Sequence, residues 1–505
     1  MNLVKKNIVA NFVGNIWYAI INLAFIPLFV KFLGVEAYGL IGIFVTLQAL
    51  FVLLDMGLSS TVTREMARLS VSTGKEQETS DLVHSLELIY WGMAVLIGIA
   101  VVTLSPLMAQ HWVKASQLSA KTIEQTLRIM GLSLVLQWPS SFYTGGLTGL
   151  QRQVLINGIK IGIATLNGVG AILILWLIAP TIKAFFLWQI VMGIVNTGLL
   201  RFFLWRCLTH TVKKPVFKKS LLVGIWKFAA GMSGVTFLGT ILSQIDKIVL
   251  SKLLSLEMFG YYMLAAAVAM SLYRLIGPVF FAVYPRFIQL VSLADQDGLK
   301  KFYHKSCQFM SVLVLPVATM IAMFSYQIML IWTQDVLTAN KTYLLVSILI
   351  CGTALNGLMN IPYALQLAYG WTSLALFTNL ISMILLIPMI LWMTHKYGAV
   401  GGASTWLILN VGYFIFVIHF MHRRLLHHEK RLWYTQDVAL PLFASLVIAG
   451  IGRLLVGGLM SNAMAIFSIT MIYLVALVAA AMITTTTRAW LVTLCSNLKK
   501  QIIDR

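Results

Sequence analysis

The chain has 505 residues, of which 59% are hydrophobic and 10% are charged, and its mean hydropathy is +0.88. Because soluble globular proteins carry roughly a quarter of charged residues, this composition excludes a cytosolic enzyme, a disordered protein and a secreted disulfide scaffold. The net charge is +21, but the basic residues lie mainly between hydrophobic segments, where they set membrane topology rather than bind nucleic acid. We therefore expect an all-α integral membrane protein.

Hydrophobic segments of about 20 residues, enough to cross a bilayer, recur along the whole chain. We expect about 14 transmembrane helices, at residues 9–30, 39–61, 82–105, 125–149, 157–179, 184–206, 227–250, 258–282, 306–328, 341–365, 372–394, 400–420, 438–459 and 463–483. Most Lys and Arg residues of the loops fall on one side, so the positive-inside rule places that side and both termini in the cytoplasm. The longest external loop, Pro106–Glu124, leaves no room for a soluble domain.

An internal repeat divides these segments into two sets of six. Lys31–Leu40 is similar to Lys252–Tyr261, 221 residues later, and a fainter match relates Pro139 to Pro362 at an offset of 223. Since six is an even number, both sets enter the membrane in the same orientation, as in transporters built from parallel repeats. We expect two bundles around a central cavity and an extra helix pair. The corresponding domains are residues 1–206, a cytoplasmic linker 207–226, residues 227–420, and the pair with its cytoplasmic tail at 421–505.

Several short motifs resemble one known family. They are Phe32–Gly39, Leu54–Arg64, Gly149–Arg152 with Asn157, and Gln244–Lys247 with Gly260–Tyr262. In combination they resemble the Wzx-type flippases of polysaccharide and O-antigen repeat units, in the multidrug/oligosaccharidyl-lipid/polysaccharide (MOP) exporter superfamily. The resemblance implies a multi-pass protein of the bacterial inner membrane. It also implies transport of an undecaprenyl-pyrophosphate-linked oligosaccharide, a precursor of lipopolysaccharide, from the cytoplasmic to the outer leaflet.

Charged and polar residues inside the spans are the candidate site, because a charge at mid-membrane usually faces the protein interior or a wet cavity. Basic residues suit the pyrophosphate, and amides and hydroxyls suit the sugars. The substrate-binding candidates are Arg274, Lys160, Lys227, Arg64, Arg286, Asn11, Asn15, Tyr18, Asn22, Thr236 and Thr240. Asp55 and Asp246 are the candidates for ion coupling or a gate. The alternatives are snorkelling or topology for the basic residues, and helix packing for the polar face of the first helix.

No catalytic triad, nucleotide motif or metal-ligand spacing is visible in the sequence, so we expect no cofactor, no metal and no enzymatic activity. The three histidines His422, His427 and His428, beside Arg423 and Arg424, are interpreted as a cytoplasmic surface cluster. Transport would then draw on an ion gradient, the membrane potential or the substrate gradient.

The leading hypothesis is a lipid-linked oligosaccharide flippase that works by alternating access as a monomer. The expected partners are the lipid-linked oligosaccharide, membrane lipids, a polysaccharide polymerase and a chain-length regulator, but no nucleic acid. The alternatives are a lipid II flippase or a multidrug exporter of the same superfamily. A membrane-embedded polymerase or ligase is less favoured because the external loops are short.

Overall fold

The computed structural model describes residues 3–55, 57–70, 74–208, 214–456 and 462–489, and the side chains among them except those of residues 3–5, 8 and 220–236. All regular elements in these ranges are helical, and the only extended pairing there is an isolated bridge between Lys114 and Ser255. The all-α prediction is confirmed.

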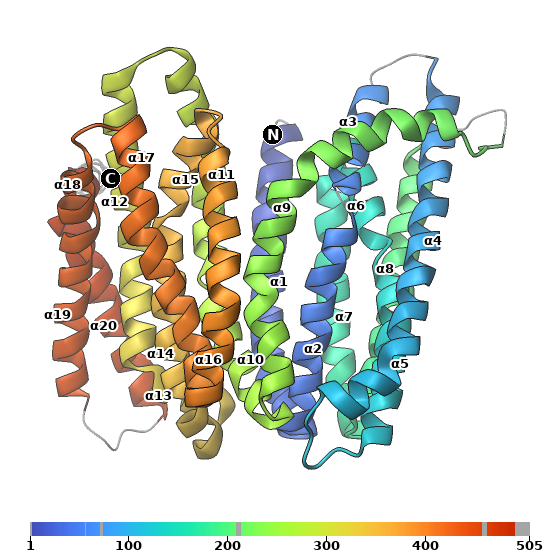
Figure 1. The fold of residues 1–505 in the computed structure, drawn as a ribbon, viewed down its shortest axis with the longest axis horizontal. Coiled ribbons are helices and arrows are strands. Elements are labelled where there is room, and N and C mark those ends of the chain that lie inside the picture. The colour runs from blue at the N-terminus through green and yellow to red at the C-terminus, as the bar shows by residue number, and fades with distance from the viewer. Residues whose placement is uncertain (1–2, 56, 71–73, 209–213, 457–461, 490–505) are drawn as a thin grey trace, which may run out of the picture. The chain divides into compact units, whose positions relative to one another are not determined.

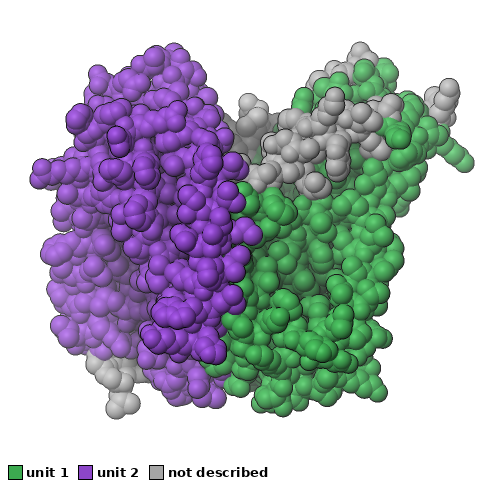
Figure 2. All heavy atoms as spheres, in the orientation of Figure 1, with its two compact units in different colours: residues 1–260 green, residues 261–505 purple. Residues whose placement is uncertain are grey.

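The chain divides into two compact units, residues 1–260 and 261–505, coloured separately in Figure 2. In unit 1, α1 packs against α7, while α5 packs against both α4 and α8 (Figure 1). Its helices are α1 (Leu3–Leu33), α2 (Val35–Phe51), η1 (Val52–Asp55), α3 (Leu58–Leu69), α4 (Glu76–Leu107), η2 (Met108–Trp112), α5 (Ala120–Gln137), α6 (Ser140–Gly149), α7 (Gln153–Leu177), α8 (Ile182–Cys207) and α9 (Lys219–Leu253).

The boundary between the units falls inside α10 (Leu256–Met270). In unit 2, α12 packs against both α14 and α19, and α19 packs against α20. Its remaining helices are α11 (Tyr273–Ser292), α12 (Gln296–Met323), α13 (Ser325–Thr333), α14 (Val336–Leu358), α15 (Asn360–Ala368), α16 (Ser373–Gly412), η3 (Tyr413–Val417), α17 (Ile418–Leu425), α18 (Lys430–Leu432), η4 (Trp433–Ala439), α19 (Leu440–Leu455) and α20 (Asn462–Ile483).

Among the described residues, 11 helical runs are long and apolar enough to cross a membrane. The difference from the predicted 14 has three local causes. The segment 125–149 is divided between α5 and α6, and 227–250 lies in α9, where part of the side chains falls outside the described residues. The segments 372–394 and 400–420 lie in one run, 373–425, which changes direction at Gly398. The number 14 stays a prediction.

Gly398 divides α16 into two helices. Its φ of +59° and ψ of −140° lie outside the helical region, in a conformation that glycine adopts without steric cost. The two halves come close directly after the break, since a Cβ on Gly401 would lie 2.0 Å from the carbonyl oxygen of Met393. The beginning of α16 and the end of α17 therefore lie at the same end of unit 2 (Figure 1).

Helix boundaries recur at nearly the offset of the sequence repeat. The helices α2 and α10 begin 221 residues apart, at Val35 and Leu256, and α5 and α14 end 221 residues apart, at Gln137 and Leu358. In both halves the second and fourth spans are broken, as shown by the short helices α3, α6 and α15. These breaks agree with a duplicated chain, although the arrangement of two equivalent bundles stays a prediction.

A reciprocal glycine contact joins the beginnings of α2 and α10 within unit 1. A Cβ on Gly39 would lie 2.4 Å from the carbonyl oxygen of Leu256, and a Cβ on Gly260 would lie 2.3 Å from that of Val35. The repeat offset of 221 maps Gly39 onto Gly260 and Val35 onto Leu256. Each repeat motif therefore packs its glycine against the equivalent backbone of the other motif, a separation that any larger residue would prevent.

The linker before α9 is fastened to α4. The carboxylate of Asp81 accepts the backbone N–H of Val216 at 2.9 Å and pairs with the Lys218 ammonium at 2.6 Å. The Ser85 hydroxyl accepts the backbone N–H of Lys218 at 2.9 Å. Asp81 is fully buried, so these contacts satisfy a carboxylate that would otherwise be costly to bury.

Candidate functional site

The polar face of α1 is directed along α7. The side-chain oxygen of Asn11 accepts a hydrogen bond from the Asn157 amide at 2.5 Å, and Trp17 donates one to Thr165 at 2.9 Å. Asn11, although exposed, is thereby tied to α7. Polar seams of this kind hold transmembrane helices together, which was one of the two interpretations of the spacing in the sequence.

Lys160 supplies a positive charge to this polar face. Its ammonium donates to the side-chain oxygen of Asn15 at 2.7 Å and lies 4.8 Å from the centre of the Tyr18 ring. Lys160 and Tyr18 are half-buried, whereas Asn15 and Asn22 are exposed, and the Asn22 amide donates to the Tyr18 carbonyl at 2.7 Å. The structure thus brings four predicted site residues, Lys160, Asn15, Tyr18 and Asn22, into one cationic and polar patch, here called the α1–α7 patch.

Asp55 occupies the break between α2 and α3. Its carboxylate accepts hydrogen bonds from the Tyr90 hydroxyl at 2.5 Å and the Ser59 hydroxyl at 2.6 Å, and from the Ser59 backbone N–H at 3.1 Å. The break requires a left-handed residue, which Gly57 supplies with a φ of +74°. Asp55 therefore satisfies the first turn of α3 with a negative charge at the helix N-terminus, where it is favourable.

A second carboxylate of unit 1 has a complete set of partners and was not among the predicted site residues. Glu87, which is 5% exposed, accepts hydrogen bonds from the Tyr143 hydroxyl and the Arg201 guanidinium, each at 2.5 Å, and from Trp205 at 3.3 Å. These partners come from α6 and α8. The signal in the sequence was the presence of Glu87 and Arg201 inside apolar spans, which by itself does not reveal that they pair.

In α9 the predicted coupling residue Asp246 is buried beside a cation. The Lys247 ammonium lies 3.4 Å from the Asp246 carboxylate and donates to the Ser243 carbonyl at 2.9 Å. Thr240 is half-buried, and its carbonyl accepts the Ser243 hydroxyl at 2.8 Å. The side chains of Lys227 and Thr236 lie outside the described residues.

In unit 2, Arg274 is exposed at the first turn of α11, directly after the break that follows α10. The neighbouring Tyr273 begins a buried chain of hydrogen bonds. Its hydroxyl donates to the Asn356 side chain at 2.8 Å, and Asn356 donates to Asn410 at 2.8 Å. Polar groups from α11, α14 and α16 therefore meet inside unit 2, a convergence that the sequence analysis did not identify.

Arg64 and Arg286 lie at matching positions of the two sequence repeats, and both are exposed. Arg64 is 4.0 Å from Glu65, and Arg286 donates to Gln289 at 3.0 Å. These contacts are local to one helix each and are compatible with both the topological and the substrate-attracting interpretations.

The interpretation of the histidines as a surface cluster is wrong for His422. This residue is 2% exposed and hydrogen-bonded to the Tyr303 hydroxyl at 3.2 Å, because its face of α17 packs against α12. Next to it, His304 bridges Asp437 at 2.5 Å and Glu429 at 3.2 Å. His427 and His428 are exposed, as expected.

Glu429 lies between two apolar helical runs, 373–425 and 430–455. Burial raises the pKa of its carboxyl, but hydrogen bonds from Lys300 and His304 outweigh this effect and hold the pKa below its usual value. No group of three or more His, Cys, Asp or Glu residues in the described part of the chain is arranged to hold a metal ion.

Comparison with known proteins shows the family. Residues 4–291 match the family model described as "Polysaccharide biosynthesis protein". A protein of Shigella flexneri whose name marks it as a candidate O-antigen transporter is 21% identical over 409 residues, which cover 80% of this chain and 94% of that protein.

Solved structures share the fold. The lipid II flippase MurJ in its inward closed conformation gives a TM-score of 0.71 at 14% identity, covering 94% of this chain and 98% of the other. An inward-facing MATE family multidrug transporter of the MOP superfamily gives 0.69 at 14% identity, covering 83% and 96%. A MOP superfamily transporter from Pyrococcus furiosus gives 0.59 at 15% identity, covering 84% and 95%. These relatives are named as transporters or flippases. Their names agree with the prediction of a transporter rather than an enzyme.

Proposed function

Because the chain belongs to the polysaccharide biosynthesis protein family and has the fold of MOP superfamily transporters, we propose that it is a lipid-linked oligosaccharide flippase. It moves an undecaprenyl-pyrophosphate-linked repeat unit of O-antigen type from the cytoplasmic to the outer leaflet of a bacterial inner membrane. Two six-helix bundles around a central cavity perform this step by alternating access, with both termini in the cytoplasm. The name of the Shigella flexneri relative supports the class of substrate.

The α1–α7 patch is the observation that carries this proposal. Lys160 is a cation inside an apolar span, and the amide of Asn15 and the ring of Tyr18 hold it in place. A lysine ammonium binds phosphate oxygens as a point charge, and the neighbouring amides offer both donors and acceptors to sugar hydroxyls. The patch thus combines the two chemistries of a lipid pyrophosphate that carries sugars.

The experiment places the purified full-length protein in liposomes and measures how fast a fluorescent undecaprenyl-pyrophosphate oligosaccharide reaches the opposite leaflet. We expect Lys160→Gln to slow translocation about tenfold or more, because a charge-assisted hydrogen bond contributes about 1.5–3 kcal/mol. Lys121→Gln, an equal charge change at an exposed position of α5, serves as the control. Translocation by the wild-type protein at the rate of empty liposomes would reject the proposed function.

We propose coupling to a cation gradient through Asp55 or Asp246. Asp55 is the stronger candidate, because the hydroxyls of Tyr90 and Ser59 hold its carboxylate, whereas the carboxylate of Asp246 lies 3.4 Å from the Lys247 ammonium. Asp55→Asn keeps an acceptor for these hydroxyls but cannot change its charge. If Asp55 carries the ion, this variant will translocate at the same rate with and without an imposed gradient. Full gradient stimulation in the variant would assign coupling to another residue.

A lipid II flippase is the second candidate, favoured by the TM-score of 0.71 to MurJ over nearly the whole chain. The same liposomes distinguish the two, since lipid II and an O-antigen-type lipid can be supplied separately. A multidrug exporter is less favoured, because the carboxylates of Glu87 and Asp246, which could attract a cationic drug, already lie beside Arg201 and Lys247. Binding to a polysaccharide polymerase and a chain-length regulator, and action as a monomer, complete the proposal.

A further inference from the structure

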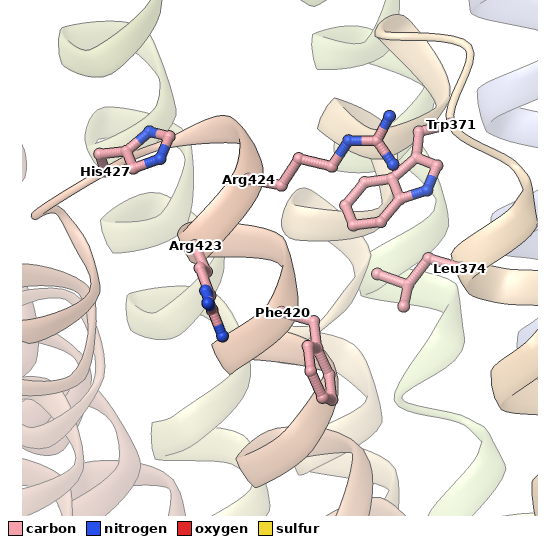
Figure 3. A pocket seen from close by; sticks show the side chains of 6 residues that line it. All are labelled: Trp371, Leu374, Phe420, Arg423, Arg424 and His427. Carbon is pink, nitrogen blue, oxygen red and sulfur yellow. The ribbon is translucent and has the colours of Figure 1, made fainter.

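A basic surface pocket lies in unit 2. It has a volume of about 480 Å³ and is formed where the turn before α16 meets α17 (Figure 3). Its walls are the two ends of the hairpin that turns at Gly398, which explains why residues about 50 positions apart share it. The lining residues are Trp371, Leu374, Phe420, Arg423, Arg424 and His427.

The charges of this pocket are positive, and no acidic residue of the described part of the chain is paired with them. None of the six lining residues is acidic, and neither Arg423 nor Arg424 pairs with a carboxylate of the described residues. Arg424 instead lies over the Trp371 ring, 4.3 Å from its centre, which fixes the plane of the guanidinium (Figure 3). Glu429, the acidic residue closest in sequence, is held by Lys300 at 3.2 Å.

The opposite side of the pocket is apolar and continues onto exposed hydrophobic surface. Phe420 is 50% exposed, and Phe416, four residues before it, is 64% exposed. On the other half of the hairpin, Leu374 is followed by Phe377, which is 60% exposed. The pocket thus combines two guanidiniums, which Figure 3 shows on different sides of the helix, with aromatic and aliphatic side chains.

We propose that this pocket binds the phosphate headgroup of an anionic membrane phospholipid. Arg424, which lies over Trp371, supplies bidentate donors to the phosphate oxygens, Arg423 adds a second positive charge to the lining, and an acyl chain lies on Phe420 and Leu374. The pocket is on the face that the distribution of Lys and Arg predicts to be cytoplasmic, where anionic lipid headgroups meet basic pockets between helices. This inference does not depend on which substrate the protein transports.

Binding is measured by native mass spectrometry of the full-length protein with phosphatidylglycerol or phosphatidylcholine. We expect preferential binding of phosphatidylglycerol, weakened about tenfold or more in the double variant Arg423→Gln/Arg424→Gln, because two charge-assisted contacts are lost. Lys301→Gln/Lys305→Gln removes the same charge from exposed positions of α12 and should leave binding unchanged. Arg423→Lys/Arg424→Lys keeps the charge but loses the planar guanidinium that donates two hydrogen bonds at once, and we expect intermediate binding. Equal losses in both glutamine double variants would overturn the proposal in favour of non-specific attraction.

Further measurements identify the source of the phosphate. If the ligand is a lipid, Phe420→Ala will weaken phosphatidylglycerol binding, and inorganic phosphate at the same concentration will not compete. Competition by inorganic phosphate, with no effect of Phe420→Ala, would contradict a lipid ligand. Displacement of phosphatidylglycerol by stoichiometric undecaprenyl-pyrophosphate oligosaccharide would also overturn it, by assigning the pocket to the transported lipid. Melting temperatures measured without lipid verify that each variant is folded.

Discussion

At the scale of single residues, two carboxylates of unit 1 are held by hydroxyl or cationic partners from other helices. Asp55 accepts the Tyr90 hydroxyl, and Glu87 accepts the Tyr143 hydroxyl together with the Arg201 guanidinium. Such hydrogen bonds offset the cost of removing a carboxylate from water. These acids therefore join η1, α4, α6 and α8 as well as carrying charge.

Removing the cation from the Glu87 cluster should destabilise the protein. We expect Arg201→Met to lower the free energy of unfolding by about 2 kcal/mol, at the low end for a broken ion pair because the arginine side chain is 56% exposed. Thermal unfolding in detergent, followed by tryptophan fluorescence, measures the change. Arg206→Met on the same helix is the control. An Arg201→Met protein as stable as this control would show that Tyr143 and Trp205 suffice for Glu87.

A polar face could be predicted from the sequence where all of its residues lie on one helix. The spacing of Asn15, Tyr18 and Asn22 showed a polar face, and the structure places Lys160 on it. The pairing of Glu87 with Arg201 could not be predicted, because 114 residues separate them and no local spacing relates two helices. The burial of His422 was missed for the same reason, since it depends on Tyr303 in a different helix.

At the scale of helices, the contacts of Gly39 with Leu256 and of Gly260 with Val35 give a symmetric prediction. Alanine at either position would place a Cβ within 2.4 Å of a carbonyl oxygen, so the beginnings of α2 and α10 would have to separate. We expect each substitution to cost about 1–3 kcal/mol of stability. Gly162→Ala, where a Cβ would meet no atom within 4 Å, should be neutral or stabilising in the same thermal unfolding assay. Unequal effects at the two glycines would argue against equivalent packing.

The beginning of α14 provides a prediction about pH. Asp335 accepts the backbone N–H of Thr338 at 2.8 Å and its hydroxyl at 2.5 Å, and the Thr338 side-chain bond chiefly holds the pKa of Asp335 below its usual value. A lowered pKa in the folded state means that this stabilisation is present at neutral pH and is lost as the pH falls through the folded-state pKa. Asp335→Ala should cost about 1 kcal/mol at pH 7 and nothing at strongly acidic pH. Equal losses at both pH values, measured by urea unfolding, would contradict a role for the ionised cap.

Helix positions could be predicted from hydropathy, but interruptions inside a span could not. Among the described residues the predicted spans lie mainly on helices, because about 20 apolar residues are enough to identify a membrane segment. The break between α5 and α6 lies inside an apolar stretch, where hydropathy does not change, whereas the turn at Gly398 falls between the predicted segments 372–394 and 400–420. Backbone conformation at a single glycine or proline decides them.

At the scale of the whole molecule, the linker between the first helix set and the second is held against α4 by its residues Val216 and Lys218. Asp81→Asn should weaken this docking by removing the charge that pairs with Lys218. We expect trypsin to cleave after Lys218 or Lys219 about tenfold faster, since a loss of about 1.5 kcal/mol raises the open population by that factor. Glu78→Gln, which removes a surface pair with Lys75 on the same helix, is the control. An unchanged cleavage rate would mean that the backbone contacts alone hold the linker.

The attachments of α9 have a consequence for synthesis of the protein. Before α9 the linker binds α4, and in the last turn of α9 Ser251 accepts a hydrogen bond from the Trp112 side chain. After α9, Leu256 donates its backbone N–H to the Lys114 carbonyl, and Gly260 contacts Val35. The first six spans therefore leave the ribosome with partners missing for α2, α4 and the segment after η2. Unit 1 can complete its packing only after residue 260 has been translated. A nascent chain arrested at residue 206 presents these surfaces to the insertion machinery, so the second repeat motif completes the folding of the first.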